Sequence, residues 1–376
     1  MHIIIAGDLV PTESNIELFN TANLNILLGR ELLDLWNSAD KRIFNLEVPL
    51  TEESKPINKC GLNLRAPKST ILGIKTLNPS LVTLANNHIL DQGARGLNST
   101  ISILKDNCIP FVGAGSNLID ASKPYIIFEN ELKVGIYACA EYEFSIATEY
   151  TPGANPFDPL ESLDHLQELK KQCDYVIVIY HGGKEHYRYP SPYLQKVSRK
   201  MVDKGTDLVV CQHSHCIGAF EKYKNSIIVY GQGNFIFNKH NNEFWNNSLL
   251  LSLTIDNNGM NIDYIPIVTT DKGVRLANLE GKNTILKEFY ERSEKLLENG
   301  FIENEYKLFA ERKIDYYLRS LFASSKLTSY IDHRILKGKL IRNKFNKKRL
   351  LAVQNYIECE AHRELILAGI KGRIEG

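Results

Sequence analysis

Two histidines, one residue apart, follow an apolar run in the second half of the chain. Residues 208–211 (LVVC) predict a buried strand, and His213 and His215 come shortly after it. In an extended backbone, residues i and i+2 point to the same face, so both imidazoles can reach one space. Imidazole is the commonest metal ligand and needs no prior deprotonation at neutral pH. The pattern therefore indicates a metal site, although two polar residues in a surface loop would give the same spacing.

Other strand-like runs also end in side chains that can bind metals. These residues are Asp8, Glu47, Asn87, His88, His181 and Asn234. Ligands of α/β folds gather at the carboxyl ends of strands, so we expect these side chains to share one site. Each of them alone would fit a turn or a helix cap equally well. Together with the two histidines they predict a metal-centred active site.

The elements that must position these residues can be followed along the sequence. Apolar runs predict strands at residues 2–6, 42–46, 81–85, 111–115, 134–140, 175–180, 208–211 and 227–230. Helical patterns occupy residues 28–38, 97–104, 160–171 and 192–203. Two further runs, at 248–255 and 261–268, are separated by Asn257-Asn258-Gly259 and predict a β-hairpin. Residues 51–66 and 142–158 predict long loops, of which the first is long enough to overhang a site.

Length and composition predict two units in an ordinary globular chain. The 376 residues exceed the usual size of one domain, and 43% hydrophobic and 24% charged residues are typical of soluble proteins. The net charge of +1 argues against a nucleic-acid-binding protein, which would carry a basic excess. We expect one domain at residues 1–270 and a mainly helical extension at residues 271–376.

The cysteines and the first residues predict a reduced, intracellular protein. The seven cysteines are scattered and form no CxxC pair, which favours free thiols over a disulfide framework. Residues 1–8 have no basic region and no cleavage site of a signal peptide, and no run has the roughly 18 apolar residues of a membrane span. We expect no integral membrane segment and a cytoplasmic location, with a peripheral membrane location as the alternative.

The composition changes after about residue 284. Residues 288–297, 303–321 and 349–367 show helical spacing of Leu, Ile, Phe and Tyr with abundant charge. Residues 337–349 carry seven basic residues and no acidic residue. A solvated helix face or a linker would explain this run. The functional alternative is a docking patch for an acidic polymer, a partner protein or an anionic membrane surface.

Several motifs, in order along the chain, resemble the CapA family. They are GD at 7–8, NLEVPLT at 45–51, ANNHILDQG at 85–93, GAGSN at 113–117, YHGGKEH at 180–186, the run 205–215 and YGQGNFIF at 230–237. The resemblance covers roughly residues 1–270. That family is linked to capsule and poly-γ-glutamate synthesis and belongs to the calcineurin-like metallophosphoesterase superfamily. The resemblance implies an α/β fold, a four-layer α-β-β-α sandwich of the metallophosphoesterase type, with a two-metal centre at the loop ends of its sheets.

The resemblance also implies roles for individual residues. The ligand set would be Asp8 and His215 for the first metal, Glu47 as the bridge, and Asn87, His181 and His213 for the second metal. His88 would be the outer-sphere acid near the leaving oxygen, and Asp91, one helical turn later, could orient it. The superfamily usually has a histidine two residues after the first aspartate, and this chain has Val10 there. The first metal site would therefore lack one ligand.

The chemistry of such a centre can be stated from its ligands. Two metals about 3.5–4 Å apart can hold a hydroxide and neutralise a phosphoryl group during in-line attack. Oxygen and imidazole ligands suit manganese, iron or zinc better than calcium, so we expect one or two divalent transition-metal ions. The residues that we expect on the substrate side are Arg65, Glu185, His186, Arg188 and Asn234. For the first four, an ordinary surface-loop position is the alternative.

Three functions remain open on the sequence. The first is a bacterial metal-dependent hydrolase that cleaves a phosphoester or phosphoanhydride by a metal-bound hydroxide, in capsule or poly-γ-glutamate biosynthesis. Its substrate would be a small molecule or an anionic polymer. The second is a γ-glutamyl amide hydrolase or transferase. The third is a non-catalytic polymer-binding or partner-binding subunit of a capsule synthesis complex, docked through the basic C-terminal helices. A serine hydrolase has less support, since the chain has no GxSxG motif.

Overall fold

The computed structural model describes residues 1–238, 242–322 and 324–375. The chain divides into two compact units, Met1–Ile302 and Glu303–Gly376. The boundary predicted at residue 270 falls inside the first unit. There, helix α9 (Leu279–Lys295) packs on strand β15 (Gly259–Thr269), and the rings of Phe289 and Tyr264 lie 4.8 Å apart between centroids.

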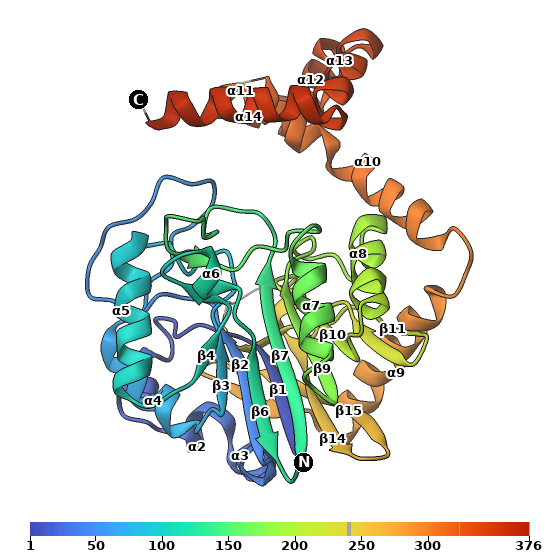
Figure 1. The fold of residues 1–376 in the computed structure, drawn as a ribbon. Coiled ribbons are helices and arrows are strands. Elements are labelled where there is room, and N and C mark those ends of the chain that lie inside the picture. The colour runs from blue at the N-terminus through green and yellow to red at the C-terminus, as the bar shows by residue number, and fades with distance from the viewer. Residues whose placement is uncertain (239–241, 323, 376) are drawn as a thin grey trace. The chain divides into compact units, whose positions relative to one another are not determined.

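Two β-sheets form the centre of the first unit (Figure 1). The first sheet has the order β16 (Val274–Leu276), β15, β14 (Asn247–Asp256), β1 (His2–Leu9), β2 (Lys41–Leu46), β3 (Leu81–Thr83) and β4 (Phe111–Val112), and β13 (Asn234–Ile236) also pairs with β1. The second sheet has the order β11 (Phe220–Tyr223), β12 (Ser226–Val229), β10 (Leu208–Gln212), β9 (Tyr175–His181), β7 (Leu132–Ala140) and β6 (Tyr125–Glu129). A separate two-stranded sheet joins β5 (Ala114–Gly115) and β8 (Gly153–Ala154).

Helices cover the outer faces of the two large sheets. The first sheet packs against α1 (Ile16–Asn20), α2 (Leu24–Leu28), α3 (Arg30–Ser38), α4 (Ile71–Thr76) and α5 (Gly93–Asp106). The second sheet packs against α7 (Ser162–Lys170) and α8 (Pro192–Asp203), and Figure 1 shows these helices on the side away from α4 and α5. Short helical segments at α6 (Leu118–Ala121), η1 (Lys68–Thr70) and η2 (Glu243–Trp245) complete the unit. The predicted α-β-β-α order of layers is confirmed.

Strand β1 shows why the apolar runs of the sequence are unbroken. Its residues alternate between two apolar layers, since Ile3 and Ile5 face the second sheet and Ile4 and Ala6 face the helices. A strand that is buried on both faces gains from an apolar side chain at every position. The run HIIIA therefore predicts a central strand, as the structure shows.

The predicted strand at residues 111–115 is wrong as a single element. The structure divides it into β4, which pairs with β3, and β5, which pairs with β8. Gly113 turns the chain between them with φ of 88°, a conformation that favours glycine. A Cβ atom there would also lie 2.7 Å from the Cβ of Ala85.

In the described residues, five helices lie in the second unit or lead into it. They are α10 (Phe301–Leu321), α11 (Lys326–Arg334), α12 (Lys339–Lys344), α13 (Lys347–Glu358) and α14 (Glu360–Glu375). The buried carboxylate of Asp332 accepts hydrogen bonds from Arg319 Nε at 3.0 Å and from the backbone N of Leu340 at 2.9 Å, and so joins α10, α11 and α12. The predicted helical character of this part is confirmed. No helix in the described residues is both long enough and apolar enough to span a membrane.

Strand β1 changes its partner at Gly7. Before this residue β1 pairs with β14, and after it Asp8 pairs with Asn234 of β13. A Cβ atom on Gly7 would lie 1.9 Å from the carbonyl oxygen of Gly233. Only glycine allows this approach, which brings the side chains of Asp8 and Asn234 to the same edge of the sheet.

We expect Gly7→Ala to destabilise the first unit by about 1–3 kcal/mol, the usual cost of overpacking. The added methyl group must push β1 away from the backbone of Gly233. Urea denaturation of the two proteins measures the difference. Gly259→Ala is the matched control, because a Cβ atom at that turn meets nothing within 4 Å. Equal losses in the two variants would contradict the close approach.

Candidate metal centre

Five polar side chains from the two large sheets meet where parallel strands end. They come from β1 (Asp8), the residue after β2 (Glu47), the end of β9 (His181) and the turn after β10 (His213 and His215). Strands β1 and β2 run parallel, as do β9 and β10, so their carboxyl ends lie together within each sheet. All five side chains are buried, with exposed fractions between 0 and 7%.

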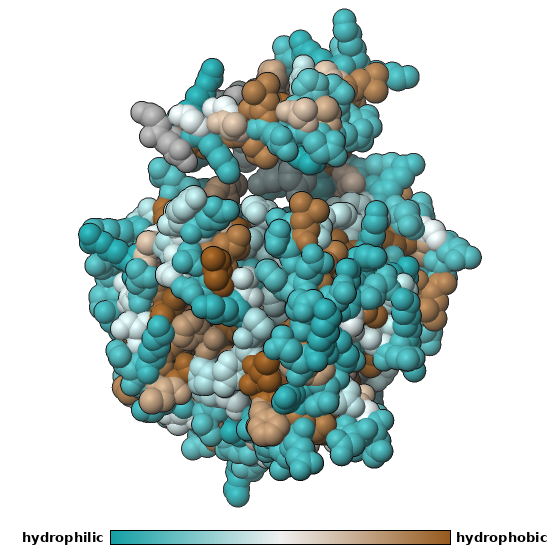
Figure 2. All heavy atoms as spheres, in the orientation of Figure 1, coloured by the Kyte–Doolittle hydropathy of each residue, from teal (hydrophilic) through white to brown (hydrophobic). Residues whose placement is uncertain are grey.

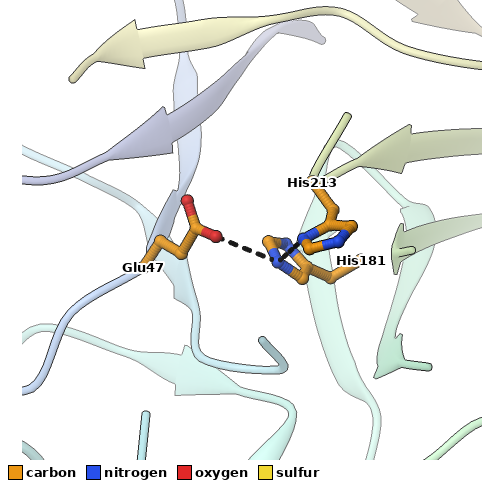
Figure 3. Close-up of side chains that lie close together, drawn as sticks. All are labelled: Glu47, His181 and His213. Atoms are coloured by element: carbon orange, nitrogen blue, oxygen red, sulfur yellow. Dashed lines mark hydrogen bonds and ion pairs between the residues drawn. The ribbon is translucent and has the colours of Figure 1, made fainter. Parts of the chain in front are cut away.

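Glu47 belongs to two adjoining sets of ligand atoms. Its carboxylate forms one set with His181 and His213, and another with Asp8 and His215, and the ligand atoms of each set lie within 4.8 Å of one another. In the first set, His181 Nε2 is 3.2 Å from Glu47 Oε1 and 3.2 Å from His213 Nδ1 (Figure 3). In the second, Asp8 Oδ2 is 3.7 Å from His215 Nδ1. A carboxylate shared in this way has the geometry that a bridge between two cations requires.

One asparagine contacts a histidine of each set. Asn87 Oδ1 lies 3.1 Å from His181 Nε2, and Asn234 Oδ1 lies 2.9 Å from His215 Nδ1. Asn234 is one of the residues predicted on the substrate side, and that role stays a prediction. It also begins β13 and does not end a strand. The division of all these residues between two metals stays a prediction.

The backbone at the two histidines differs from the predicted extended form. His213 has φ of 84° and His215 has φ of 53°, both in the left-handed region. The prediction that alternation along a strand aims both rings into one space is therefore wrong, although the rings do converge, with centroids 6.0 Å apart. Such a conformation costs a residue with a side chain on the order of 1–3 kcal/mol and persists only where the surroundings hold it. One such contact is the hydrogen bond from the His213 backbone N to Asp8 Oδ2, at 3.3 Å.

The buried surroundings of Asp8 and Glu47 disfavour the charged forms of their carboxylates. Burial raises the pKa of Asp8 to about 7, and the neighbouring charge of Glu47 adds to the shift. Burial raises the pKa of Glu47 to about 8; His88 opposes this shift and Glu185 adds to it. Neither oxygen of Glu47 has a hydrogen-bond partner in the described part of the chain. Buried polar atoms are rarely left without a partner, so these oxygens indicate a place for a cation.

The three imidazoles are held in the neutral form. Burial lowers the pKa of His215 to about 3, and it also lowers the pKa values of His181 and His213. A neutral imidazole has a lone pair with which to bind a metal. The combination of carboxylate oxygens and neutral imidazole nitrogens fits a divalent transition metal, and it fits a hard cation such as calcium less well.

Asn45 is a residue of the centre that the sequence analysis did not single out. Its Nδ2 donates to Asp8 Oδ1 at 2.7 Å and lies 3.2 Å from His181 Nδ1. Its Oδ1 accepts from Asn86 Nδ2 at 3.1 Å. Asn45 therefore holds a carboxylate of the first sheet and an imidazole of the second in fixed positions. The available signal was its position on β2, two residues before Glu47.

His88 lies beside the centre in contact with Asp91 and Lys59. His88 Nδ1 is 2.5 Å from Asp91 Oδ2, which is the contact that the predicted orienting role of Asp91 requires. Lys59 forms an ion pair with Asp91, and its Nζ lies 3.2 Å from His88 Nδ1. The side chain of Lys59 is only 3% exposed and that of Asp91 is fully buried. The sequence placed Lys59 in an overhanging loop but gave no sign that it is buried.

The predicted substrate-side residues lie in different surroundings. His186 stands next to the centre, because Trp245 Nε1 donates to His186 Nε2 at 2.9 Å and the Trp245 ring lies 4.5 Å from that of His215. The guanidinium of Arg188 lies 4.9 Å from the centroid of the Phe244 ring, which also stacks on His186. No pattern in the sequence indicated Trp245.

Glu185 and Arg65 are the two exposed members of the predicted substrate side. Glu185 is near enough for its charge to raise the pKa of Glu47. Arg65 donates to the backbone carbonyl of Glu52 at 2.9 Å, a contact within its own loop. Val10, at the position of the missing histidine, is buried in the apolar layer between the first sheet and its helices. It offers no ligand to the centre.

The comparisons with known proteins agree on one family. Residues 2–239 match the family model described as "Bacterial capsule synthesis protein PGA_cap". The chain is similar to the capsule biosynthesis protein CapA of Bacillus anthracis, with 32% identity over 234 residues, which cover 59% of this chain and 56% of that protein. It is also similar to the PGA biosynthesis protein CapA of Bacillus subtilis (strain 168), with 30% identity over 211 residues, which cover 54% and 55%. The match thus spans about half the length of these curated relatives.

One of the similar solved structures is a 5′-nucleotidase precursor from Thermus thermophilus. The sequence identity is 14% and the TM-score is 0.40, and the match covers 77% of this chain and 57% of that chain.

We expect the metal-free protein to lose stability as the pH rises from about 6.5 to about 8. Asp8 and Glu47 have pKa values of about 7 and about 8 in the folded state, above their ordinary values, so the folded state holds more protons than the unfolded state in this range. Stability therefore falls as these protons dissociate. The buried histidines have the opposite effect, but they act mainly below about pH 6.5, the ordinary histidine pKa.

Thermal unfolding in EDTA across this pH range measures the effect. Glu47→Gln should show a weaker dependence, because one of the two titrating groups is gone. Added Mn²⁺ should raise the Tm most at the upper end, since the metal competes with protons for the carboxylates. A Tm in EDTA that rises between pH 6.5 and 8 would contradict the expectation.

We expect Lys59→Met to destabilise the first unit by about 3–5 kcal/mol, the usual cost of leaving a buried charge without its partner. The double variant Lys59→Met/Asp91→Asn should recover part of this loss, because the remaining amide is neutral. Denaturant unfolding of the single and double variants gives the coupling energy. Lys68→Met, at an exposed position, is the control. A loss at Lys59 no greater than that of the control would show that the ion pair contributes nothing.

Proposed function

The chain belongs to the bacterial capsule synthesis protein family PGA_cap, and from this premise we propose that it is a metal-dependent hydrolase of phosphoesters or phosphoanhydrides. The proposal rests mainly on the surroundings of the Glu47 carboxylate. This carboxylate is fully buried, lacks a hydrogen-bond partner for either oxygen among the described residues, and is shared by two sets of ligand atoms. A buried carboxylate with these properties suits a bridge between two divalent cations, for which manganese, iron or zinc fits the ligands best.

The residues of this chain that would hold the cations come from both sheets. They are Asp8 and His215 for one ion, His181, His213 and Asn87 for the other, and Glu47 for both. Divalent cations bound here would act as Lewis acids on a phosphoryl group and would lower the pKa of water. Asn45 keeps the Asp8 carboxylate aimed into the centre through its hydrogen bond of 2.7 Å.

His88 is the residue that would protonate the leaving group. Its Nδ1 is engaged by Asp91, so Nε2 is the nitrogen available to give a proton to the leaving oxygen as its bond to phosphorus breaks. Asp91 fixes the orientation of the imidazole, and Lys59 balances the charge of Asp91. The net reaction is the addition of water across the phosphorus–oxygen bond, which yields an alcohol or a second phosphate.

The rim formed by His186, Arg188 and Trp245 is the proposed substrate side. The Trp245 ring lies 4.5 Å from that of His215, so this aromatic group adjoins the centre. Arg188 offers a cation for an anionic group away from the reacting phosphoryl group. The printed names of the relatives connect them with capsule and PGA biosynthesis. We therefore propose a phosphorylated precursor, or an end of an anionic cell-envelope polymer, as the class of substrate.

Hydrolysis of an aryl phosphate with added Mn²⁺ tests the proposal. We expect His213→Ala/His215→Ala to abolish turnover and to lower the metal content per chain, because the variant removes one ligand from each set. We expect His88→Asn to lower kcat by about 10²–10⁴-fold, the usual contribution of a general acid, without loss of metal. The matched control is His333→Ala/His362→Ala, which removes two exposed imidazoles of the second unit.

The same assay separates the alternatives. Cleavage of a polyglutamate in preference to the aryl phosphate would favour amide chemistry at the same centre. A wild-type protein that holds no transition metal and cleaves no aryl phosphate with Mn²⁺ would refute the hydrolase proposal. Function in cells that survives in the double histidine variant would instead favour a non-catalytic subunit.

A further inference from the structure

The last two helices of the second unit expose large apolar side chains. Helix α13 has no buried residue, and α13 and α14 contact each other. The most exposed apolar side chains of this pair are Leu351, Ile357, Leu365, Leu367, Ile370 and Ile374, with exposed fractions between 51 and 73%. Figure 2 shows apolar side chains at the surface of these helices, interspersed with hydrophilic ones. We call these two helices the apolar helix pair.

The positive charge of the chain is concentrated in the same unit. Residues 303–376 contain sixteen basic and nine acidic residues, whereas residues 1–302 contain twenty-nine basic and thirty-five acidic residues. The nearly neutral net charge of the whole protein therefore hides a basic second unit. The basic run at residues 337–349 leads directly into α13.

The first turn of α13 carries charges of the unfavourable sign. It contains Lys347, Lys348 and Arg349 and no acidic residue. The N-terminus of a helix bears a partial positive charge, so basic side chains there destabilise the helix. Anionic groups at this end would offset the repulsion between the basic side chains and the helix N-terminus, because they would interact favourably with both.

One side of helix α14 carries an apolar stripe and two basic residues, whereas the exposed Leu365 falls on the opposite side. Ile366, Ile370 and Ile374 recur every four residues and form a stripe along the helix. By helical position, Arg363 and Arg373 fall on the same side as this stripe, and Glu364 falls on the other. Long basic side chains next to an apolar stripe can lay their stems along apolar material and keep their charges in a polar layer.

We propose that the apolar helix pair and the preceding basic run dock on an anionic membrane surface. A lipid surface with anionic headgroups offers phosphates to the lysines and arginines and acyl chains to the leucines and isoleucines. A soluble acidic polymer would leave the apolar side chains in water, and a second copy of this basic unit would be repelled by its charge. Since no described helix is long and apolar enough to span a membrane, the pair would lie in the interface. This inference goes beyond the proposed hydrolase function and does not depend on it.

Flotation of the purified full chain with lipid vesicles tests the proposal. We expect binding to vesicles that contain phosphatidylglycerol to be at least about tenfold stronger than to pure phosphatidylcholine, and to weaken at high salt. Lys344→Glu/Lys347→Glu/Lys348→Glu and Ile366→Ser/Ile370→Ser/Ile374→Ser should each reduce binding at least about tenfold. Circular dichroism checks that both variants keep their helices.

Matched triple variants in the first unit are the controls. Lys68→Glu/Lys75→Glu/Lys287→Glu reverses three exposed lysines, and Leu62→Ser/Ile119→Ser/Leu160→Ser removes apolar side chains that are 72–79% exposed. Both should bind vesicles as the wild type does. Glu47→Ala should also bind as the wild type does, which shows that vesicle binding does not depend on the proposed metal centre. Equal binding to both kinds of vesicle, or to neither, overturns the inference. Lysine-dependent binding to soluble polyglutamate without vesicle binding, or a dimer abolished by the apolar triple variant, also overturns it.

Discussion

The burial of Glu47 without hydrogen-bond donors is the constraint on which the candidate centre depends. In an interior of low dielectric constant, a carboxylate is costly unless donors or a cation compensate its charge. Asp8 receives such compensation from Asn45 and from the backbone N of His213. Glu47 receives no hydrogen bond from the described residues, and burial raises its pKa to about 8, although the charge of His88 opposes this shift. A buried carboxylate without hydrogen bonds, next to one that has them, indicates the point where a cation would bind.

The two sheets divide the ligands by chemical type. The first sheet carries the carboxylates, and the second carries the imidazoles, so the distance between the sheets sets the distance between the two kinds of ligand. Buried glutamine side chains help to fix this distance. Gln212 Nε2, on the second sheet, donates to the carbonyl of Ala6 at 3.2 Å, and Gln232 Nε2 donates to those of Ile5 at 3.2 Å and Leu249 at 3.1 Å. The geometry of the centre is therefore a property of the packed core.

The sequence predicts those site residues whose positions follow from the ends of parallel strands. Parallel strands bring their last residues together, which is why Asp8, Glu47 and His181 could be assigned to one site before any coordinates were known. The left-handed backbone at His213 could not be foreseen, because it depends on contacts made only in the folded chain. The burial of Lys59 has the same origin, since its partner Asp91 lies in a different segment. Local pattern thus locates the strand ends, whereas tertiary contacts decide the final orientation of each side chain.

The loop at residues 51–66 contacts the segment that carries His88 at several points. The ion pair of Lys59 with Asp91 is one attachment, and the backbone N atoms of Ile57 and Leu64 donate to Asp91 O at 3.1 Å and to Asp91 Oδ2 at 2.5 Å. The Oδ2 atom that receives the loop is also the one that contacts the imidazole of His88. One carboxylate atom therefore contacts both the loop and the ring. A displacement of Asp91 would loosen the loop and change the orientation of the His88 ring at the same time, so the two share a single anchor.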